Sequence, residues 1–196
     1  MRTLSVSFAI LAIAYATPAL AQDKAGDPQA ERIAAARTAI KGLGEGLKQK
    51  LMGAMTDGGP VAALDVCKID APKLAAERSS ASGMDVGRTA LKVRNAGNAP
   101  DDFEKRVMEK FIADIKGGAD PMKLDHAEVV EQDGKKVFRY MKPIMTAESP
   151  CLACHGASSD LSPEVTAKIK ELYPADQATG FKAGDMRGAF TVKKAL

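Results

Sequence analysis

The residues of this 196-residue chain best suited to redox or metal chemistry are its three cysteines and two histidines. Most of them lie in one short run, Cys151-Leu152-Ala153-Cys154-His155, which has the C-x-x-C-H pattern of c-type haem attachment. Two thiols at this spacing on a helical turn can bind the two vinyl groups on one porphyrin edge, and the histidine then follows as an axial iron ligand. The run therefore predicts one covalently attached haem c, bound by Cys151 and Cys154 and ligated by His155.

Other chemistries of a C-x-x-C pair fit this segment less well. A thioredoxin-like disulfide needs its motif at the end of a buried strand in a βαβ unit, whereas Thr-Ala-Glu-Ser-Pro precedes Cys151. A zinc site needs two separated groups of ligands, and the adjacent Cys154 and His155 cannot easily both face one tetrahedral ion. A structural disulfide would leave His155 unexplained.

The first 21 residues have the pattern of a cleaved signal peptide. Arg2 supplies the positive n-region, residues 4–16 are mostly apolar, and Ala19-Leu20-Ala21 is a small-x-small cleavage site. No later stretch reaches the ~18 continuous apolar residues of a membrane span. We therefore expect a periplasmic protein without a membrane span after cleavage. Thiols usually pair in that oxidising compartment, so the odd number of cysteines leaves at least one with another role.

The second axial position of the haem has three kinds of candidate. Cys67 lies on the apolar stripe of an expected helix, and iron ligation would protect a thiol that lacks a partner. An inert core cysteine is the plainer interpretation of that stripe. His126 is the remaining histidine, although an exposed position at a helix-to-strand junction explains it better. The third kind is methionine, mostly expected as core filling: Met52, Met55, Met84, Met108, Met122, Met141, Met145 and Met186.

The composition is that of one globular domain over residues 22–196. Hydrophobic residues make up 45% of the chain and charged residues 27%, which excludes a disordered chain. The net charge of +3 comes from interspersed basic and acidic residues with no run that could follow a phosphate backbone. Tryptophan is absent and aromatic residues are only 5%, so there is no platform for stacking bases. We expect no nucleic-acid partner.

The elements that must position the haem motif begin with helices. Apolar residues at helical spacing predict a helix over 29–55, a break at the Asp-Gly-Gly-Pro run of 57–60, and a second helix over 61–78 that Pro72 kinks or splits. Asp101 and Glu104 form a capping box at the start of a later helix.

Strands and short helices follow in the second half of the chain. Asp133-Gly134 between two extended runs is the strongest hairpin signal, and Ser162-Pro163 begins another short helix. The expected strands cover 84–94, 127–132, 135–145 and 186–192. This order favours an α+β domain with an antiparallel sheet and an N-terminal helical arm.

Several segments also occur in an order and spacing typical of one family. They are Val66-Cys67, Arg94-Asn95, Asn98-Ala-Pro-Asp101 with Glu104, Arg139 to Ile144, and Cys151 to Gly156. Together they resemble the exported PAS-like single-haem proteins, a domain that also forms the periplasmic sensing part of histidine kinases and chemoreceptors. The resemblance covers most of the mature chain. It implies a PAS-like antiparallel sheet flanked by helices, and axial ligation by His155 and Cys67.

These observations lead to a functional prediction. Two strong protein ligands leave no iron position for substrate, so we predict a monohaem c-type cytochrome, not an enzyme, that acts in electron transfer or redox sensing with a redox partner protein. A thiolate ligand stabilises ferric iron and predicts a low reduction potential. One alternative is a haem-based gas sensor with a labile distal ligand. A peroxidase-type enzyme is a weaker alternative, because it needs distal acid and base groups and only His126 is spare.

The haem propionates should pair with cationic or polar side chains. Candidates flank the strands nearest the motif in sequence order, and ordinary solvated strand ends explain them equally well. They are Arg88, Arg94, Tyr140 and Lys142.

Overall fold

The computed structural model describes residues 27–196, so the expected signal peptide of residues 1–21 lies outside the described part of the chain. Its helical elements, which include a π-helical turn (η1) and a 3-10 turn (η2), are α1 (Pro28–Asp65), η1 (Val66–Asp70), α2 (Ala71–Ser82), η2 (Ala96–Asn98), α3 (Asp102–Lys116), α4 (Leu152–His155) and α5 (Pro163–Leu172). The strands are β1 (Asp85–Thr89), β2 (His126–Gln132), β3 (Lys135–Met145) and β4 (Met186–Ala195).

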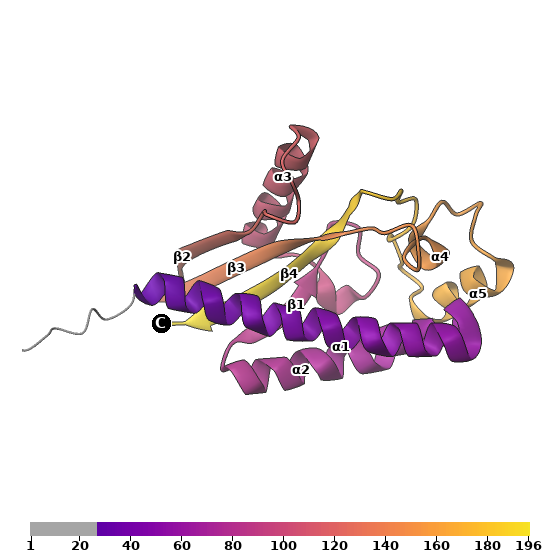
Figure 1. Ribbon diagram of the computed structural model, residues 1–196, viewed down its shortest axis with the longest axis horizontal. Coiled ribbons are helices and arrows are strands. Elements are labelled where there is room, and N and C mark those ends of the chain that lie inside the picture. The colour runs from indigo at the N-terminus through magenta and orange to yellow at the C-terminus, as the bar shows by residue number, and fades with distance from the viewer. Residues whose placement is uncertain (1–26) are drawn as a thin grey trace, which may run out of the picture.

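The strands form one antiparallel sheet in the order β1-β4-β3-β2. The predicted hairpin is confirmed, since β2 and β3 pair around Asp133 and Gly134, which both have positive φ. Helices cover both faces of the sheet (Figure 1). The predicted α+β class with a flanked antiparallel sheet and an N-terminal helix is therefore confirmed, and the arrangement is compatible with a PAS-like domain.

Alternation along the strands gives the sheet two apolar faces. The long helix α1 runs along one face together with α2 (Figure 1), and the buried side chains between them and the strands include Ile40, Leu43, Leu74, Val86, Phe138, Tyr140 and Val192. The other face packs against α3 through Phe103, Val107, Met108, Phe111, Met141 and Ala189. The capping box predicted for α3 is present, with Asp101 accepting from Glu104 N–H and Glu104 accepting from Asp101 N–H.

The predicted break in the N-terminal helices is confirmed at Gly58 and Gly59, which leave helical geometry. Gly59 has φ +68°, a conformation that glycine adopts without strain. The helix expected over 61–78, which Pro72 was predicted to kink or split, is divided into the end of α1, η1 and α2, and Pro72 lies in the first turn of α2. Proline has no N–H to bond the carbonyl four residues earlier, and the preceding turn widens into the π-helical η1. Cys67 lies in this widened turn.

Two strands differ in length from the prediction. β1 ends at Thr89, whereas the sequence predicted a strand to residue 94, because Ala90 N–H donates to Asn98 O (3.3 Å) and the chain turns away over η2. β4 continues to Ala195, beyond the predicted residue 192, because it lies between β1 and β3 and pairs with both. The loop after β1 is therefore free to carry Arg94 away from the sheet.

A small third cluster attaches α5 to the end of α1 through Leu64, Leu161, Val165 and Ile169, with Cys154 packed against it. Both α4 and α5 lie at one end of the sheet (Figure 1). Among residues 27–196, no helix has the length and apolar character needed to cross a bilayer.

Candidate functional site

A cavity of about 440 Å³ brings together the residues that the sequence selected for chemistry. Its walls come from α1, η1, the end of β3, α4 and the start of β4. Most of the lining is apolar and includes Leu47, Leu51, Met55, Leu64, Ile144 and Phe190. Cys151, Cys154 and His155 form part of one wall, and Cys67 lines the same cavity from η1.

The cysteines of the site are held by local backbone structure. The short helix α4 carries the motif, and His155 N–H donates to Cys151 O at 2.9 Å. None of the three cysteines forms a disulfide in the described part of the chain. Burial raises the pKa of the Cys154 thiol to about 11, and it also raises that of Cys67, which nearby arginines oppose. The π-helical turn that holds Cys67 is a distortion often found at functional positions.

The imidazole of His155 has one defined tautomer. Its Nδ1 lies 2.7 Å from the carbonyl oxygen of Ala178. A carbonyl oxygen only accepts, so Nδ1 carries the proton and Nε2 keeps a free lone pair. Arg187 Nε also lies 3.3 Å from Nδ1, but a protonated Nδ1 cannot accept a hydrogen bond from it. Burial and the charges of Arg94 and Arg187 lower the pKa of His155 to about 3, so the ring is neutral near pH 7.

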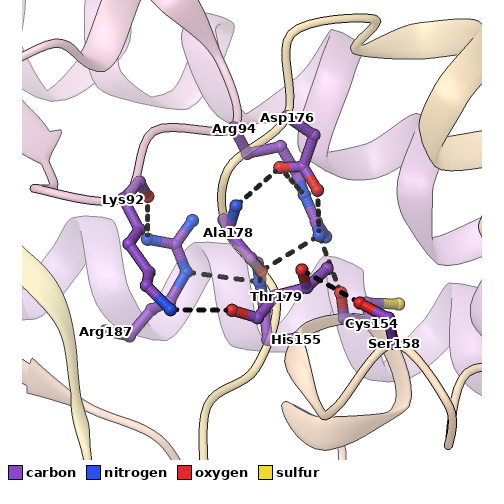
Figure 2. A network of polar contacts seen from close by, with 9 residues as sticks. All are labelled: Lys92, Arg94, Cys154, His155, Ser158, Asp176, Ala178, Thr179 and Arg187. Carbon is purple, nitrogen blue, oxygen red and sulfur yellow. Dashed lines mark hydrogen bonds and ion pairs between the residues drawn. The ribbon is translucent and has the colours of Figure 1, made fainter.

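Arg94 is the centre of a buried polar network beside the motif (Figure 2). Its Nε donates to Asp176 Oδ1 (2.9 Å) and its Nη2 to Asp176 Oδ2 (3.0 Å). The same Nη2 also donates to Cys154 O (2.7 Å) and to Ala178 O (3.2 Å). Burial raises the pKa of Asp176, but the hydrogen bonds from Arg94 and from Ala178 N–H outweigh it and hold the pKa below its ordinary value.

Cationic side chains exceed carboxylates at the polar end of the site. A smaller cavity of about 120 Å³ is lined by Cys67, His155 and the guanidinium groups of Arg88, Arg94 and Arg187, and by no carboxylate. Burial and the charges of the other two arginines lower the pKa of Arg187 to about 10. Burial also lowers the pKa of Arg88. Such a cluster is suited to a ligand with more than one negative charge.

The residues present fit a haem c. Two thiols and a histidine with a free Nε2 share an apolar cavity, and the arginine cluster matches the two negative charges of the propionates. A bare metal ion fits less well, because no three or more His, Cys, Asp or Glu side chains converge to hold one within residues 27–196. Of the candidate propionate partners, Arg88 and Arg94 line the cavity.

The other two candidate propionate partners do not line this cavity. Tyr140 is fully buried in the core under α1, and its hydroxyl donates to Asp125 Oδ2 at 3.0 Å. Lys142 donates to the carbonyls of Met122 (2.8 Å) and Leu124 (3.1 Å). Both side chains bond to the segment just before β2. Their proximity to the motif in sequence therefore does not place them beside it in space.

The candidates for the second axial position also differ in whether they line this cavity. His126 lies on β2, where its Nε2 contacts Glu128 Oε2 (3.1 Å) and its ring packs on Phe103. It does not line the cavity. Among the methionines, Met55 and Met145 line it, whereas Met84, Met108 and Met141 are buried in the core clusters and Met52 and Met122 are exposed. Cys67, Met55 and Met145 are therefore the described side chains that compete for this position.

Sequence reasoning missed Arg187, Asp176 and Ala178. Arg187 was expected only as part of a strand, and the register shift between β3 and β4 that leaves it without a partner in β3 is not visible in the sequence. The segment of Asp176 and Ala178 follows Pro174 and has no motif. Its Gly180 N–H bonds to Gly156 O (2.7 Å) and its Phe181 N–H to His155 O (3.0 Å), contacts that a sequence pattern does not show.

A protein family and a solved structure are similar to this chain. The model of the Tll0287-like family matches residues 19–194. The crystal structure of the cyanobacterial haem protein Tll0287 is similar to this chain, with a TM-score of 0.60 and 29% sequence identity over 87% of this chain and 98% of that one. No curated protein matches the chain. Because the family match covers nearly the whole sequence, this chain belongs to the Tll0287-like family.

Proposed function

We propose that this chain is a periplasmic monohaem c-type cytochrome that acts in electron transfer or redox sensing. One observation carries the proposal: Cys67, Cys151, Cys154 and His155 come from two distant parts of the sequence and line one apolar cavity. The similarity to a cyanobacterial haem protein supports it, as does the C-x-x-C-H pattern.

In this proposal, Cys151 and Cys154 would attach the haem covalently, and His155 Nε2 and Cys67 Sγ would hold its iron. When bound, the haem supplies one-electron exchange between ferric and ferrous iron. The apolar side chains of α1 and the sheet exclude water from the cavity. Arg88 and Arg187 neutralise the propionates, because Arg94 is already paired with Asp176.

Two protein ligands would make the site suitable for electron exchange with a redox partner protein and leave no position for substrate. The alternative is a gas-sensing module, in which Cys67 would be a labile ligand that a small molecule could replace. A peroxidase-type enzyme is less well supported, because His126 is away from the cavity.

Absorption spectra of the haem-loaded protein, oxidised and reduced, with and without CO, test this proposal. We expect a pyridine haemochrome of the c type, a low-spin oxidised spectrum, and no change of the reduced spectrum with CO. Rapid CO binding would instead support the gas-sensing alternative. A chain that attaches no haem when matured with a c-type assembly system would contradict both.

Variants of the competing ligands test the identity of the sixth one. Cys67→Ala should produce a high-spin or CO-binding haem and raise the reduction potential, because it removes an anionic ligand. Met55→Leu and Met145→Leu are the matched controls, since each keeps an apolar side chain in the same cavity. A Cys67→Ala protein with the wild-type spectrum and potential, or a Met variant that changes both, would overturn the assignment of Cys67.

A further inference from the structure

Arg94 joins three segments that are remote in sequence and meet behind His155. It comes from the loop after β1, its side chain is only 6% exposed, and its carboxylate partner Asp176 is 82 residues away. The planar guanidinium binds both oxygens of Asp176, an arrangement that fixes its direction. The same Nη2 that bonds Asp176 also donates to two backbone carbonyls, that of Cys154 in the C-x-x-C-H motif and that of Ala178 in the segment that contacts His155, so its two N–H groups are shared among three acceptors.

The carbonyl oxygen of Ala178 links this network to the imidazole. It accepts from His155 Nδ1 at 2.7 Å and from Arg94 Nη2 at 3.2 Å. Ala178 N–H in turn donates to Asp176 Oδ1 at 3.0 Å. Asp176 and Arg94 therefore hold the backbone of Ala178 at its N–H and at its C=O, respectively, as Figure 2 shows.

The segment around Ala178 is also tied to the motif by its own backbone. Gln177 N–H bonds to Val93 O (2.8 Å), next to Arg94. Gly180 and Phe181 bond to the carbonyls of Gly156 and His155. The carbonyl of Ala178 is consequently held in place by backbone bonds to the loop of Arg94 and to the C-x-x-C-H segment.

We propose that Arg94 is a positioning residue for His155 and that, through Asp176 and the Ala178 carbonyl, it sets the tautomer and the ligand strength of the imidazole. This inference rests on the proposed function, and it gives Arg94 a different role from the propionate partner that the sequence suggested. Hydrogen bonds to the second nitrogen of a ligating histidine fix its ring and raise its basicity. Arg94 shares the accepting oxygen, so it weakens that effect and keeps the reduction potential higher than Ala178 alone would.

Arg94→Lys tests the role while keeping the positive charge. A single ammonium group cannot hold both oxygens of Asp176 and two carbonyls at once. We expect normal haem content, a lower reduction potential and changed electron paramagnetic resonance g-values of the oxidised haem. Arg139→Lys is the matched control, because Arg139 is a similarly buried arginine paired with Asp101 and Glu104 and lines neither cavity. It should lower the thermal midpoint and leave the potential and g-values unchanged.

Asp176→Asn keeps the size of the side chain but removes the negative charge. We expect it to raise the reduction potential, because the uncompensated Arg94 charge then disfavours ferric iron. Opposite shifts in Arg94→Lys and Asp176→Asn support the positioning role. If both variants only lower the thermal midpoint, as Arg139→Lys does, the role of Arg94 is structural and the inference is wrong.

A failure of the proposed function is distinguishable from a failure of this inference. If the wild-type chain attaches no haem, the proposed function fails, and the tautomer of His155 remains measurable through the ¹⁵N shifts of its two ring nitrogens. Wild type should then show a protonated Nδ1, and Arg94→Lys a mixture of tautomers. An unchanged Nδ1–H tautomer in Arg94→Lys would overturn the positioning role in the haem-free chain as well.

Discussion

Two buried arginine networks lie in different regions of this domain, and their charge balance differs. On the α3 face of the sheet, Arg139 and Lys193 face Asp101 and Glu104, so two cationic groups meet two carboxylates. Beside the C-x-x-C-H motif, Arg94 pairs with Asp176, and Arg88 and Arg187 line the same small cavity as Arg94, which no carboxylate lines. The first network is balanced in charge, whereas the excess positive charge of the second, half-buried one is suited to an anionic ligand.

The two networks also differ in the partners that the arginine binds. Arg139 bonds to carboxylates at the start of α3 and so fastens a helix to the sheet. Arg94 binds one carboxylate and two backbone carbonyls, both next to residues of the candidate site. Similar ion-pair chemistry thus fastens a helix in one region, and in the proposed function it positions His155 in the other.

Truncation of either arginine should have the largest effect on stability. Arg94→Ala leaves the buried Asp176 without its cationic partner, and we expect it to lower the free energy of unfolding by about 3–5 kcal/mol. Arg139→Ala leaves the buried Glu104 paired with Lys193 alone, and we expect it to cost somewhat less. Urea unfolding of the haem-loaded proteins measures the change. Arg139→Ala should keep the wild-type reduction potential. A shifted potential in Arg139→Ala would break the distinction between the two networks.

The next largest effect is expected where Gly188 of β4 lies close to the backbone at the end of β1, beside the smaller cavity. A Cβ at Gly188 would collide with Thr89 O and lie 3.1 Å from Ala90 Cβ. Gly188→Ala should therefore lower the free energy of unfolding by about 1–3 kcal/mol through overpacking. Gly87→Ala is the control in the paired strand, where a Cβ would have only an ordinary contact with Thr191 at 3.8 Å. Equal thermal midpoints for the two variants would contradict the predicted clash.

Replacing the N-cap residue should lower the free energy of unfolding by different amounts in α3 and in α5. Ser162 accepts from Val165 N–H and caps α5, so Ser162→Ala should cost about 1 kcal/mol. Asp101 caps α3 and also binds Arg139 and Lys193. Asp101→Ala should consequently cost more than Ser162→Ala in urea unfolding. The reverse order would show that the α3 network adds little beyond the cap.

The smallest expected effect is on how steeply the free energy of unfolding declines at acid pH. Burial raises the pKa of Asp101, but hydrogen bonds from Glu104 N–H, Arg139 and Lys193 outweigh it, and the pKa of Asp176 is lowered for a similar reason. Each ionised carboxylate thus stabilises the folded state above its unfolded pKa of about 3.8, and this contribution is lost as the pH falls through the lower folded pKa. Asp101→Asn and Asp176→Asn should each flatten the decline of stability between about pH 5 and pH 2, measured by urea unfolding. A decline as steep as that of wild type would exclude the carboxylate concerned as a source of acid sensitivity.

Local signals predicted several elements correctly because their causes lie within a few residues. The hairpin depends on Asp133 and Gly134, the start of α3 on Asp101 and Glu104, and the helix break on the Gly58-Gly59 pair. The strand after Met84 was predicted too long, because its end depends on a bond between Ala90 and Asn98 across a loop.

The propionate candidates show where sequence order is a poor guide to space. Tyr140 and Lys142 lie close to the motif in sequence, yet their polar atoms bind Asp125 and the carbonyls before β2. Arg187 was not selected, yet it lies beside His155. Which end of a strand faces a cavity depends on the register and order of the sheet, and neither is visible in a single strand pattern.

The sequence by itself determined the chemistry that this chain can carry: a C-x-x-C-H motif, one further cysteine, and an α+β order of elements. These properties depend on residue type and short spacing. Only the tertiary structure decided which distant groups meet. The π-helical turn brings Cys67 to the cavity of the motif, and Arg94 reaches Asp176 and the Ala178 carbonyl. Such contacts join segments more than 80 residues apart, so they follow from the packing of helices and sheet and not from local pattern.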